Sequence, residues 1–275
     1  MTERTRGDLC PGVFRPWPAD DGALVRLRIP GGHLSRTTLL SLLDVAEAHG
    51  DGQVHLTTRA NLQLRALPLV DGAVPEEVVE AVRATGLLPH PDHELVRNLL
   101  VSPLTGLAGG RADLRPVTTE LDKRICATPS LARLPGRFLF VLDDGRGDLL
   151  DRSCDLGLVA LSEDEVQLRV GSTRWGPVVP LTEAAARLTG LARAFQQVRG
   201  RGEDAAWHVD ELPVAPEAHD ADVRLPDPAE PPAYGEVAPG VAHVAVEGGV
   251  LDRASAGHLP EHLVVTPWKS LVAHG

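Results

Sequence analysis

The sequence predicts an α+β fold in which helices cover one face of antiparallel sheets, with the unit duplicated and its second copy incomplete. Residues 53–66 alternate apolar and polar side chains, which indicates a half-buried antiparallel hairpin. Helical patterns of apolar residues flank this hairpin on both sides, and helices on one face of such a sheet form an α+β sandwich. A strand, turn, helix and strand return in the same order near residue 250.

The elements of the first copy follow from its pattern and its turn residues. Residues 22–30 alternate as a strand that ends at Pro30. Ser35 caps a helix whose apolar side chains recur at helical spacing until Gly50. The hairpin comes next, and a second helix is predicted over residues 74–85. The predicted order is therefore strand, helix, hairpin and helix.

The remaining chain divides into segments by composition. Short strands are predicted at residues 138–142, 156–161, 166–170 and 177–179, and an amphipathic helix at residues 182–200. Residues 211–240 hold seven prolines and seven acids against one base, Arg224, which predicts an extended, solvated connector. The predicted domains are an N-terminal arm with the first copy at 1–95, an α+β domain at 96–210, the Pro/acidic linker at 211–240 and a partial second copy at 241–275.

The repeat is carried by two pairs of segments. Residues 29–36 align with residues 246–253, and both contain a Gly-Gly pair. Residues 54–57 align with residues 263–266, and both end in Thr. The helix between them is shorter in the second copy. If that copy is cut short, no return strand follows Trp268, and the last residues are expected to pack poorly.

Composition excludes several classes of protein. The chain has 275 residues and 27 basic against 38 acidic side chains, a net charge of −11 that argues against a general nucleic-acid or anionic membrane surface. No apolar stretch reaches the length of a spanning helix, and no signal peptide is recognisable. The three cysteines form neither a disulfide framework nor closely spaced metal-ligand pairs. We expect a soluble, cytoplasmic protein with no metal ligands.

The polar face of the hairpin is the first candidate site. Arg59 and Arg65 project from it together with Thr57, Asn61 and Gln63. Guanidinium groups on a rigid sheet can hold the carboxylates of an anionic ligand through paired, charge-assisted hydrogen bonds. A polar face that merely meets water explains the same pattern, and periodicity alone favours that reading.

Two further segments carry candidate residues. Arg97 and Asn98 stand together where the second domain begins, and a turn with a solvated Arg explains them equally well. Arg137 directly precedes the apolar strand at 138–142, where an Arg is often only an edge charge. Neither segment identifies a ligand by itself.

Taken in order, five segments resemble the nitrite/sulfite reductase superfamily, and within it most closely the precorrin-3B synthase branch of aerobic cobalamin biosynthesis. They are Arg6–Gly12, Gly52–Leu64 with its Thr-Thr-Arg-x-Asn-x-Gln hairpin, Val96–Asn98, Leu134–Phe138 and Leu263–Lys269. The resemblance implies ferredoxin-like half-domains built around a siroheme-like or precorrin tetrapyrrole, which agrees with the repeat.

The resemblance also implies roles for single residues. Arg59 and Asn61 would line the tetrapyrrole site, with Arg65 on the same face, and Arg97 and Asn98 would contact the ligand from the next domain. Arg59 and Arg137 would be the catalytic residues, since Arg137 stands where sulfite-reducing members have a substrate-binding Lys. Leu139 replaces their second Lys. That loss argues against reduction of a small oxyanion and favours the synthase branch, which hydroxylates a polycarboxylate ring with oxygen and forms a lactone.

The resemblance breaks down at the iron–sulfur cluster. Members bind a [4Fe–4S] cluster through four cysteines in two close pairs, whereas this chain has only Cys10, Cys126 and Cys154. Three interpretations stay open. The chain is a shortened enzyme, or a second chain supplies the iron–sulfur half, or the protein is a non-catalytic tetrapyrrole-binding or partner subunit.

Overall fold

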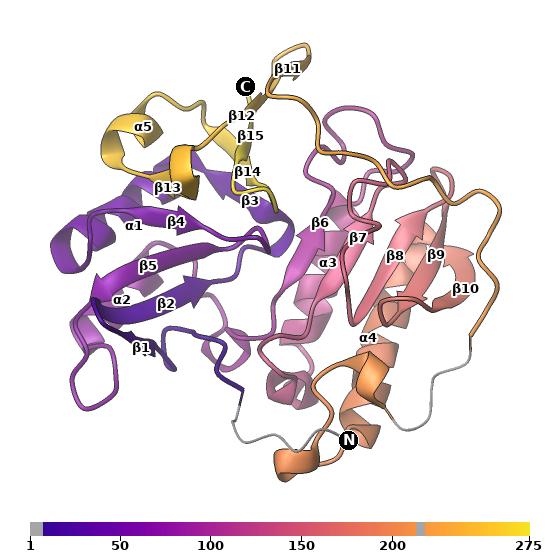
Figure 1. Ribbon diagram of the computed structural model, residues 1–275, viewed down its shortest axis with the longest axis horizontal. Coiled ribbons are helices and arrows are strands. Elements are labelled where there is room, and N and C mark those ends of the chain that lie inside the picture. The colour runs from indigo at the N-terminus through magenta and orange to yellow at the C-terminus, as the bar shows by residue number, and fades with distance from the viewer. Residues whose placement is uncertain (1–7, 213–217) are drawn as a thin grey trace. The chain divides into compact units, whose positions relative to one another are not determined.

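A computed structural model of the chain describes residues 8–212 and 218–275 (Figure 1). Arg6 and Gly7 of the first motif therefore lie outside the described residues. The described residues group by their contacts into a two-sheet unit, residues 10–95 with 232–275, and a one-sheet unit, residues 8–9 with 96–231. The division into domains at residues 95, 210 and 240 stays a prediction.

The first sheet of the two-sheet unit has the strand order β1-β2-β5-β4-β13, and its pairings are antiparallel. Its strands are β1 (Trp17–Ala19), β2 (Gly22–Leu27), β5 (Leu62–Leu67), β4 (Val54–Leu56) and β13 (Val250–Leu251). The predicted strand and hairpin are confirmed. The apolar face is fully buried, as at Val25 and Leu64 (0% exposed).

The second sheet repeats this order as β11-β12-β15-β14-β3, again with antiparallel pairings. Its strands are β11 (Gly235–Ala238), β12 (Val241–Val244), β15 (Leu271–His274), β14 (His262–Val265) and β3 (His33–Ser35). The expectation that no return strand follows Trp268 is wrong, because β15 is that strand. Leu271 and Val272 in it are fully buried, so this part of the chain is packed.

The two copies exchange their edge strands. β3 of the first copy pairs with β14 of the second, and β13 of the second copy pairs with β4 of the first. In Figure 1 the yellow β13 lies beside the purple β4. This reciprocal exchange makes the two copies one folding unit, and it confirms the duplicated α+β architecture.

The helices differ between the copies. The first copy has α1 (Arg36–His49), whose Ser35 cap accepts a hydrogen bond from Thr38 N (2.9 Å), and α2 (Glu76–Ala84). Both helices were predicted, the second with slightly wider bounds. The second copy has only the short α5 (Arg253–Gly257), capped by Asp252. That the second copy is incomplete stays a prediction.

The one-sheet unit has the strand order β10-β9-β8-β7-β6. The strands are β6 (Leu99–Val101), β7 (Phe140–Asp143), β8 (Leu156–Ala160), β9 (Glu165–Val170) and β10 (Trp175–Pro180). The β6–β7 and β7–β8 pairings are parallel, and the other two are antiparallel. The helix α4 (Leu181–Val198) matches its prediction, whereas β6 and α3 (Arg115–Cys126) were not predicted.

Short helical turns and an ordered connector complete the fold. The 3-10 helices are η1 (Pro30–Gly32), η2 (Pro91–His93), η3 (Pro129–Arg133), η4 (Gly202–Asp204), η5 (Val209–Glu211) and η6 (Glu247–Gly249). The Pro/acidic connector is extended as predicted but is held to the sheet, since His219 N donates to Trp175 O (2.9 Å) and Gln167 Nε2 donates to Asp220 O (2.7 Å). No helix in the described part of the chain is both long and apolar enough to cross a membrane.

Candidate anion-binding site

The tip of the β4–β5 hairpin, residues 57–61, is closed by hydrogen bonds. Thr57 N donates to Asn61 O (3.0 Å), Ala60 N donates to Thr57 O (3.0 Å), and Asn61 N donates to Thr57 Oγ1 (3.1 Å). Ala60 takes a left-handed φ of 54°, which a tight turn here requires. The turn leaves the half-buried Arg59 side chain at the end of the hairpin.

Asn61 is part of the scaffold at this tip. Its side chain is 1% exposed, and its Oδ1 accepts a hydrogen bond from Ile29 N (3.0 Å). This contact joins the hairpin tip to the chain that leaves β2. A buried amide with this partner holds the backbone around Arg59 in place. Its predicted contact with a ligand stays a prediction.

Two arginines that sequence reasoning did not select belong to the same site. Arg26 on β2 pairs with Gln63 on β5, and its Nη2 donates to Gln63 Oε1 (3.3 Å). Arg28 is only 3% exposed, and its Nη1 donates to Pro11 O and to Arg26 O (2.8 Å). Both residues have the polar parity of the predicted strand, which was the available signal.

An acid and the N-terminal arm complete what we call the Arg28 cluster: Arg15, Arg26, Arg28, Arg59 and Glu94. Glu94 is buried, and its two carboxylate oxygens accept hydrogen bonds from Val13 N (2.7 Å) and Phe14 N (3.0 Å). A Cβ on Gly12 would lie 2.4 Å from Glu94 Oε1, which explains the glycine of the Cys-Pro-Gly motif. The cluster therefore holds four guanidinium groups and one carboxylate.

The electrostatics of the cluster favour an anion. Burial, together with the nearby charges of Arg26 and Arg59, lowers the pKa of Arg28 to about 10 against the attraction of Glu94. The Nε atoms of Arg26 and Arg28 are buried and donate to no acceptor among the described residues. Buried donors without an acceptor are costly. An anionic group bound beside the cluster would offset its excess of positive charge.

Arg65, at the far end of β5 from the tip, has a local partner. Its guanidinium lies 3.1 Å from Asp21 Oδ2, and both side chains are exposed. The hydrogen bond to Arg65 lowers the pKa of Asp21. Arg65 is thus an exposed member of an ion pair, and its predicted role at the ligand stays a prediction.

Arg97, Asn98 and Arg137 lie in the one-sheet unit. Arg97 makes a bidentate ion pair with Asp122 on α3, with both N–O distances at 2.8 Å. Asn98 is buried, and its Nδ2 donates to Gly136 O (2.9 Å) and Phe138 O (3.2 Å). The structure therefore brings Asn98 to the segment that carries the exposed Arg137, at the amino ends of the neighbouring strands β6 and β7. Their predicted contacts with a ligand stay predictions.

The sequence motifs meet within this unit. Asp8 Oδ2 accepts a hydrogen bond from Gly136 N (2.5 Å), so the first motif contacts the Leu-Pro-Gly-Arg motif. Leu139, which takes the place of a second Lys, is 7% exposed. Its backbone N donates to Asp155 Oδ2 (2.8 Å), and its side chain adds no positive charge beside Arg137.

Comparison with known proteins shows which family the sheet that contains the β4–β5 hairpin resembles. A family model described as the nitrite/sulfite reductase ferredoxin-like half domain matches residues 18–73. Residues 18–73 are therefore similar to a nitrite/sulfite reductase half domain. The matched residues include β2, the hairpin and three of the cluster arginines, Arg26, Arg28 and Arg59. The candidate site therefore lies mostly inside the half domain.

Curated relatives and a solved structure extend the likeness beyond the half domain. The ferredoxin–nitrite reductase of Synechococcus elongatus is 31% identical over 227 residues, covering 73% of this chain and 44% of the relative. The precorrin-3B synthase of Sinorhizobium sp is 31% identical over 146 residues, covering 51% and 29%. The NirA protein of Mycobacterium tuberculosis shares the fold with a TM-score of 0.69 at 18% identity, covering 91% and 53%. The chain thus spans less than half the length of these curated relatives.

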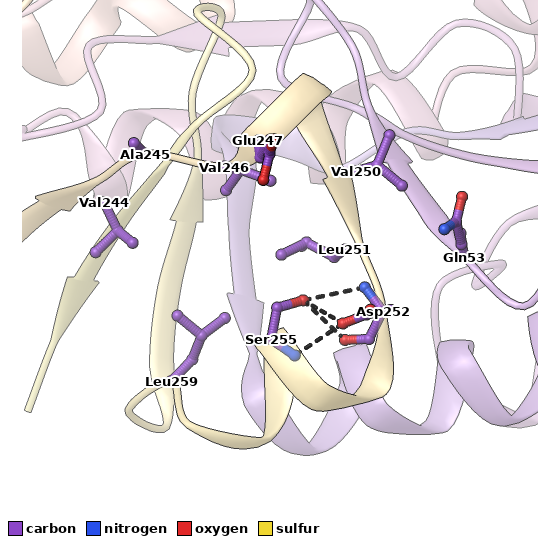
Figure 2. A pocket seen from close by; sticks show the side chains of 10 residues that line it. All are labelled: Gln53, Val244, Ala245, Val246, Glu247, Val250, Leu251, Asp252, Ser255 and Leu259. Carbon is purple, nitrogen blue, oxygen red and sulfur yellow. Dashed lines mark hydrogen bonds between the residues drawn. The ribbon is translucent and has the colours of Figure 1, made fainter.

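A separate cavity of ≈ 470 Å³ lies in the second copy of the half domain (Figure 2). Figure 2 shows apolar side chains around it, including Val244, Leu251 and Leu259. The charged residues that line it are the acids Glu247 and Asp252, and Asp252 accepts the hydrogen bond of Ser255 N (2.8 Å). Carboxylates at the rim disfavour an anionic ligand, so this cavity is not the predicted site.

The one-sheet unit has a second cationic surface. A hollow of ≈ 1030 Å³ is lined by Arg133, Arg193, Arg199 and Arg201. The Arg199 guanidinium already donates to Ala206 O (2.8 Å) and Arg133 O (3.0 Å). None of these arginines belongs to the motifs. This hollow provides a control for unspecific attraction of anions.

The cysteines do not fit an iron–sulfur cluster. Cys10 lies in the two-sheet unit, whereas Cys126 and Cys154 lie in the one-sheet unit. Burial raises the pKa of Cys126 to about 11 and that of Cys154 to about 12, which disfavours the thiolates that a cluster needs. Within residues 8–212 and 218–275, no three His, Cys, Asp or Glu side chains come together as metal ligands.

Proposed function

We propose that this chain binds an anionic tetrapyrrole through its half domain and acts as an oxidoreductase of the precorrin-3B synthase or nitrite/sulfite reductase type. The observation that carries the proposal is the Arg28 cluster, which has four guanidinium groups, one carboxylate and two buried Nε donors without acceptors. Tetrapyrroles of this kind carry several carboxylates around a flat ring. The named relatives, a nitrite reductase and a precorrin-3B synthase, support the same ligand class.

The residues would divide the work of holding this ligand. Arg59 at the hairpin tip would bind a ring carboxylate, while the positive charges of Arg26 and Arg28 attract the same edge of the ligand. The predicted contacts of Arg97, Asn98 and Arg137 with the ligand remain part of the proposal. A bound siroheme would supply redox chemistry. Because Leu139 removes a second cation, a polycarboxylate ring is a better substrate than a small oxyanion.

A binding subunit without redox activity is the second candidate. The specific observation in its favour is that the three cysteines are divided between two units and two of them have raised pKa values. In this case a second chain would supply the iron–sulfur half. Analysis of iron and sulfide after anaerobic purification separates the candidates, because a stoichiometric cluster is expected only for the enzyme.

Titration with uroporphyrin or siroheme, followed by absorbance, tests ligand binding. We expect saturable binding and a loss of about tenfold or more in affinity for Arg59→Ala, the range expected for a hydrogen-bonded charged pair. Arg193→Ala, in the other cationic hollow, is the matched control and should bind normally. Absence of binding, or equal losses in both variants, would contradict the proposal.

A further inference from the structure

The second copy of the half domain has a hairpin tip built like the first. Thr266 N donates to Ser270 O (3.0 Å), Lys269 N donates to Thr266 O (3.3 Å), and Ser270 N donates to Thr266 Oγ1 (3.2 Å). Lys269 has a left-handed φ of 58°, as Ala60 has in the first tip. The two turns thus correspond residue by residue. Trp268 takes the position that Arg59 holds in the first copy.

Contacts within the unit bring the two tips to the same region. Asn61 of the first tip accepts a hydrogen bond from Ile29 N, and Ile29 directly precedes η1. Gly32 at the end of η1 lies close to the second tip, since a Cβ on it would be 2.3 Å from Val265 O. Reciprocally, a Cβ on Gly249 of η6 would lie 2.9 Å from Lys269 Cβ in the second tip. The following residue, Val250, pairs with His55 of β4. The first tip is therefore linked through η1 to β14, the strand that leads into the second tip. The second tip is linked through η6 and β13 to β4, the strand that leads into the first tip.

The Trp268 ring packs against His243, whose own position is fixed by hydrogen bonds. Trp268 is half-buried, and its ring lies edge-on to the ring of His243, with 5.8 Å between centroids and an angle of 64°. His243 is 2% exposed and is fixed by Pro232 O (2.7 Å) and Ser270 Oγ (2.7 Å). Tyr234 also packs against this imidazole, with 4.5 Å between the ring centroids. A ring held in this way can offer a face to a ligand with little loss of freedom.

We infer that Trp268 forms an aromatic wall of the proposed tetrapyrrole site, stacking against the ring while the Arg28 cluster holds its carboxylates. The inference rests on the proposed function. It adds a contact for the flat ring of the ligand, which the arginines do not recognise. A flat aromatic ring with charged edges presents two kinds of surface. The two copies supply one partner for each: guanidinium groups from the first and an indole from the second.

Quenching of tryptophan fluorescence by uroporphyrin tests the inference. Wild-type protein should show quenching that saturates with ligand binding. Trp268→Phe should lose most of that quenching and keep nearly normal affinity, because a phenyl ring still stacks. Trp268→Ala should weaken binding about fivefold, as expected for one aromatic pair. Trp207→Phe, in the one-sheet unit, is the control and should leave the saturable quenching in place.

The outcomes distinguish this inference from the proposed function. If absorbance shows no binding to the wild-type protein, the proposed function and the inference both fail. If the wild type binds, Arg59→Ala weakens binding and Trp268→Ala changes neither quenching nor affinity, the inference alone is overturned. Circular dichroism of each variant confirms that a lost signal does not come from unfolding.

Discussion

In the first copy, Arg26 lies on β2, Arg28 directly follows β2, and Arg59 lies at the hairpin tip. The second copy holds His243, Ala245 and Trp268 at the same positions. The strand order and the hydrogen bonds of the tips are the same in both copies. What differs is the polar face, cationic in one copy and aromatic in the other. The backbone is therefore set by turns and pairing, while the chemistry is set by side chains that the backbone tolerates.

The largest effect is expected for the glycines that end the two equivalent turns. Gly32 and Gly249 both have left-handed φ values, 76° and 70°. A Cβ on Gly32 would meet a backbone oxygen, Val265 O, at 2.3 Å, whereas a Cβ on Gly249 would meet Lys269 Cβ at the longer distance of 2.9 Å. Gly32→Ala should cost about 3 kcal/mol and Gly249→Ala about 1 kcal/mol, since the first contact is the closer one and involves the backbone of a sheet strand. Thermal unfolding of both variants measures the difference, and equal losses would contradict it.

The next largest effect concerns the residues that end the two hairpin tips. Asn61→Ala removes the acceptor of the Ile29 N–H, which should cost about 2 kcal/mol because a buried donor is left without a partner. Ser270→Ala removes the hydroxyl partner of His243 Nε2 and should cost about 1 kcal/mol. Thermal unfolding of both variants measures the two losses. A loss for Asn61→Ala no larger than that for Ser270→Ala would contradict this assignment.

The sequence predicts those parts of the comparison that depend on local pattern. The alternation of residues 53–66 predicted the hairpin, and Ser35 predicted the start of α1. The exchange of β3 and β13 could not be predicted, because these strands have three and two residues and pair with partners far along the chain. Strands this short show no periodicity.

Of the Arg28 cluster, the sequence predicted only Arg59. Arg59 stands in a polar alternating run and carries a family motif, so sequence selects it. Arg28 shares that parity but is buried, because Glu94 and the arm at Pro11 fold over it from elsewhere in the chain. A local sequence pattern does not show contacts between residues that are far apart along the chain. The same reasoning explains β15, whose four residues showed no repeat signal before its pairing with β14 was known.

The smallest effect, and the one that best isolates charge, is expected for Glu94→Gln. Burial raises the pKa of Glu94 above its usual range, and the hydrogen bonds from Val13 and Phe14 and the charges of Arg28 and Arg15 offset this only in part. The folded state therefore holds the Glu94 proton more tightly than the unfolded chain does. Wild-type stability should fall as pH rises from the ordinary glutamate range through the raised pKa, and Glu94→Gln should show a smaller slope, because the raised pKa values of Asp144 and Asp148 still contribute.

At pH 7 the same variant no longer has a charge to desolvate, but its amide has one acceptor oxygen and loses one of the hydrogen bonds from Val13 N and Phe14 N. The two effects oppose each other, so its stability should stay within about 1 kcal/mol of the wild type. The Arg28 cluster would then keep four guanidinium groups without its one carboxylate. Affinity for uroporphyrin should rise about fivefold, which corresponds to about 1 kcal/mol, the interaction of two unit charges about 4 Å apart in bulk water. Unfolding from pH 4 to 8 and absorbance titration at pH 7 measure both effects. A fall in affinity would show that Glu94 positions the arginines more than it opposes the ligand's charge, and it would weaken the contrast between a cationic and an aromatic copy.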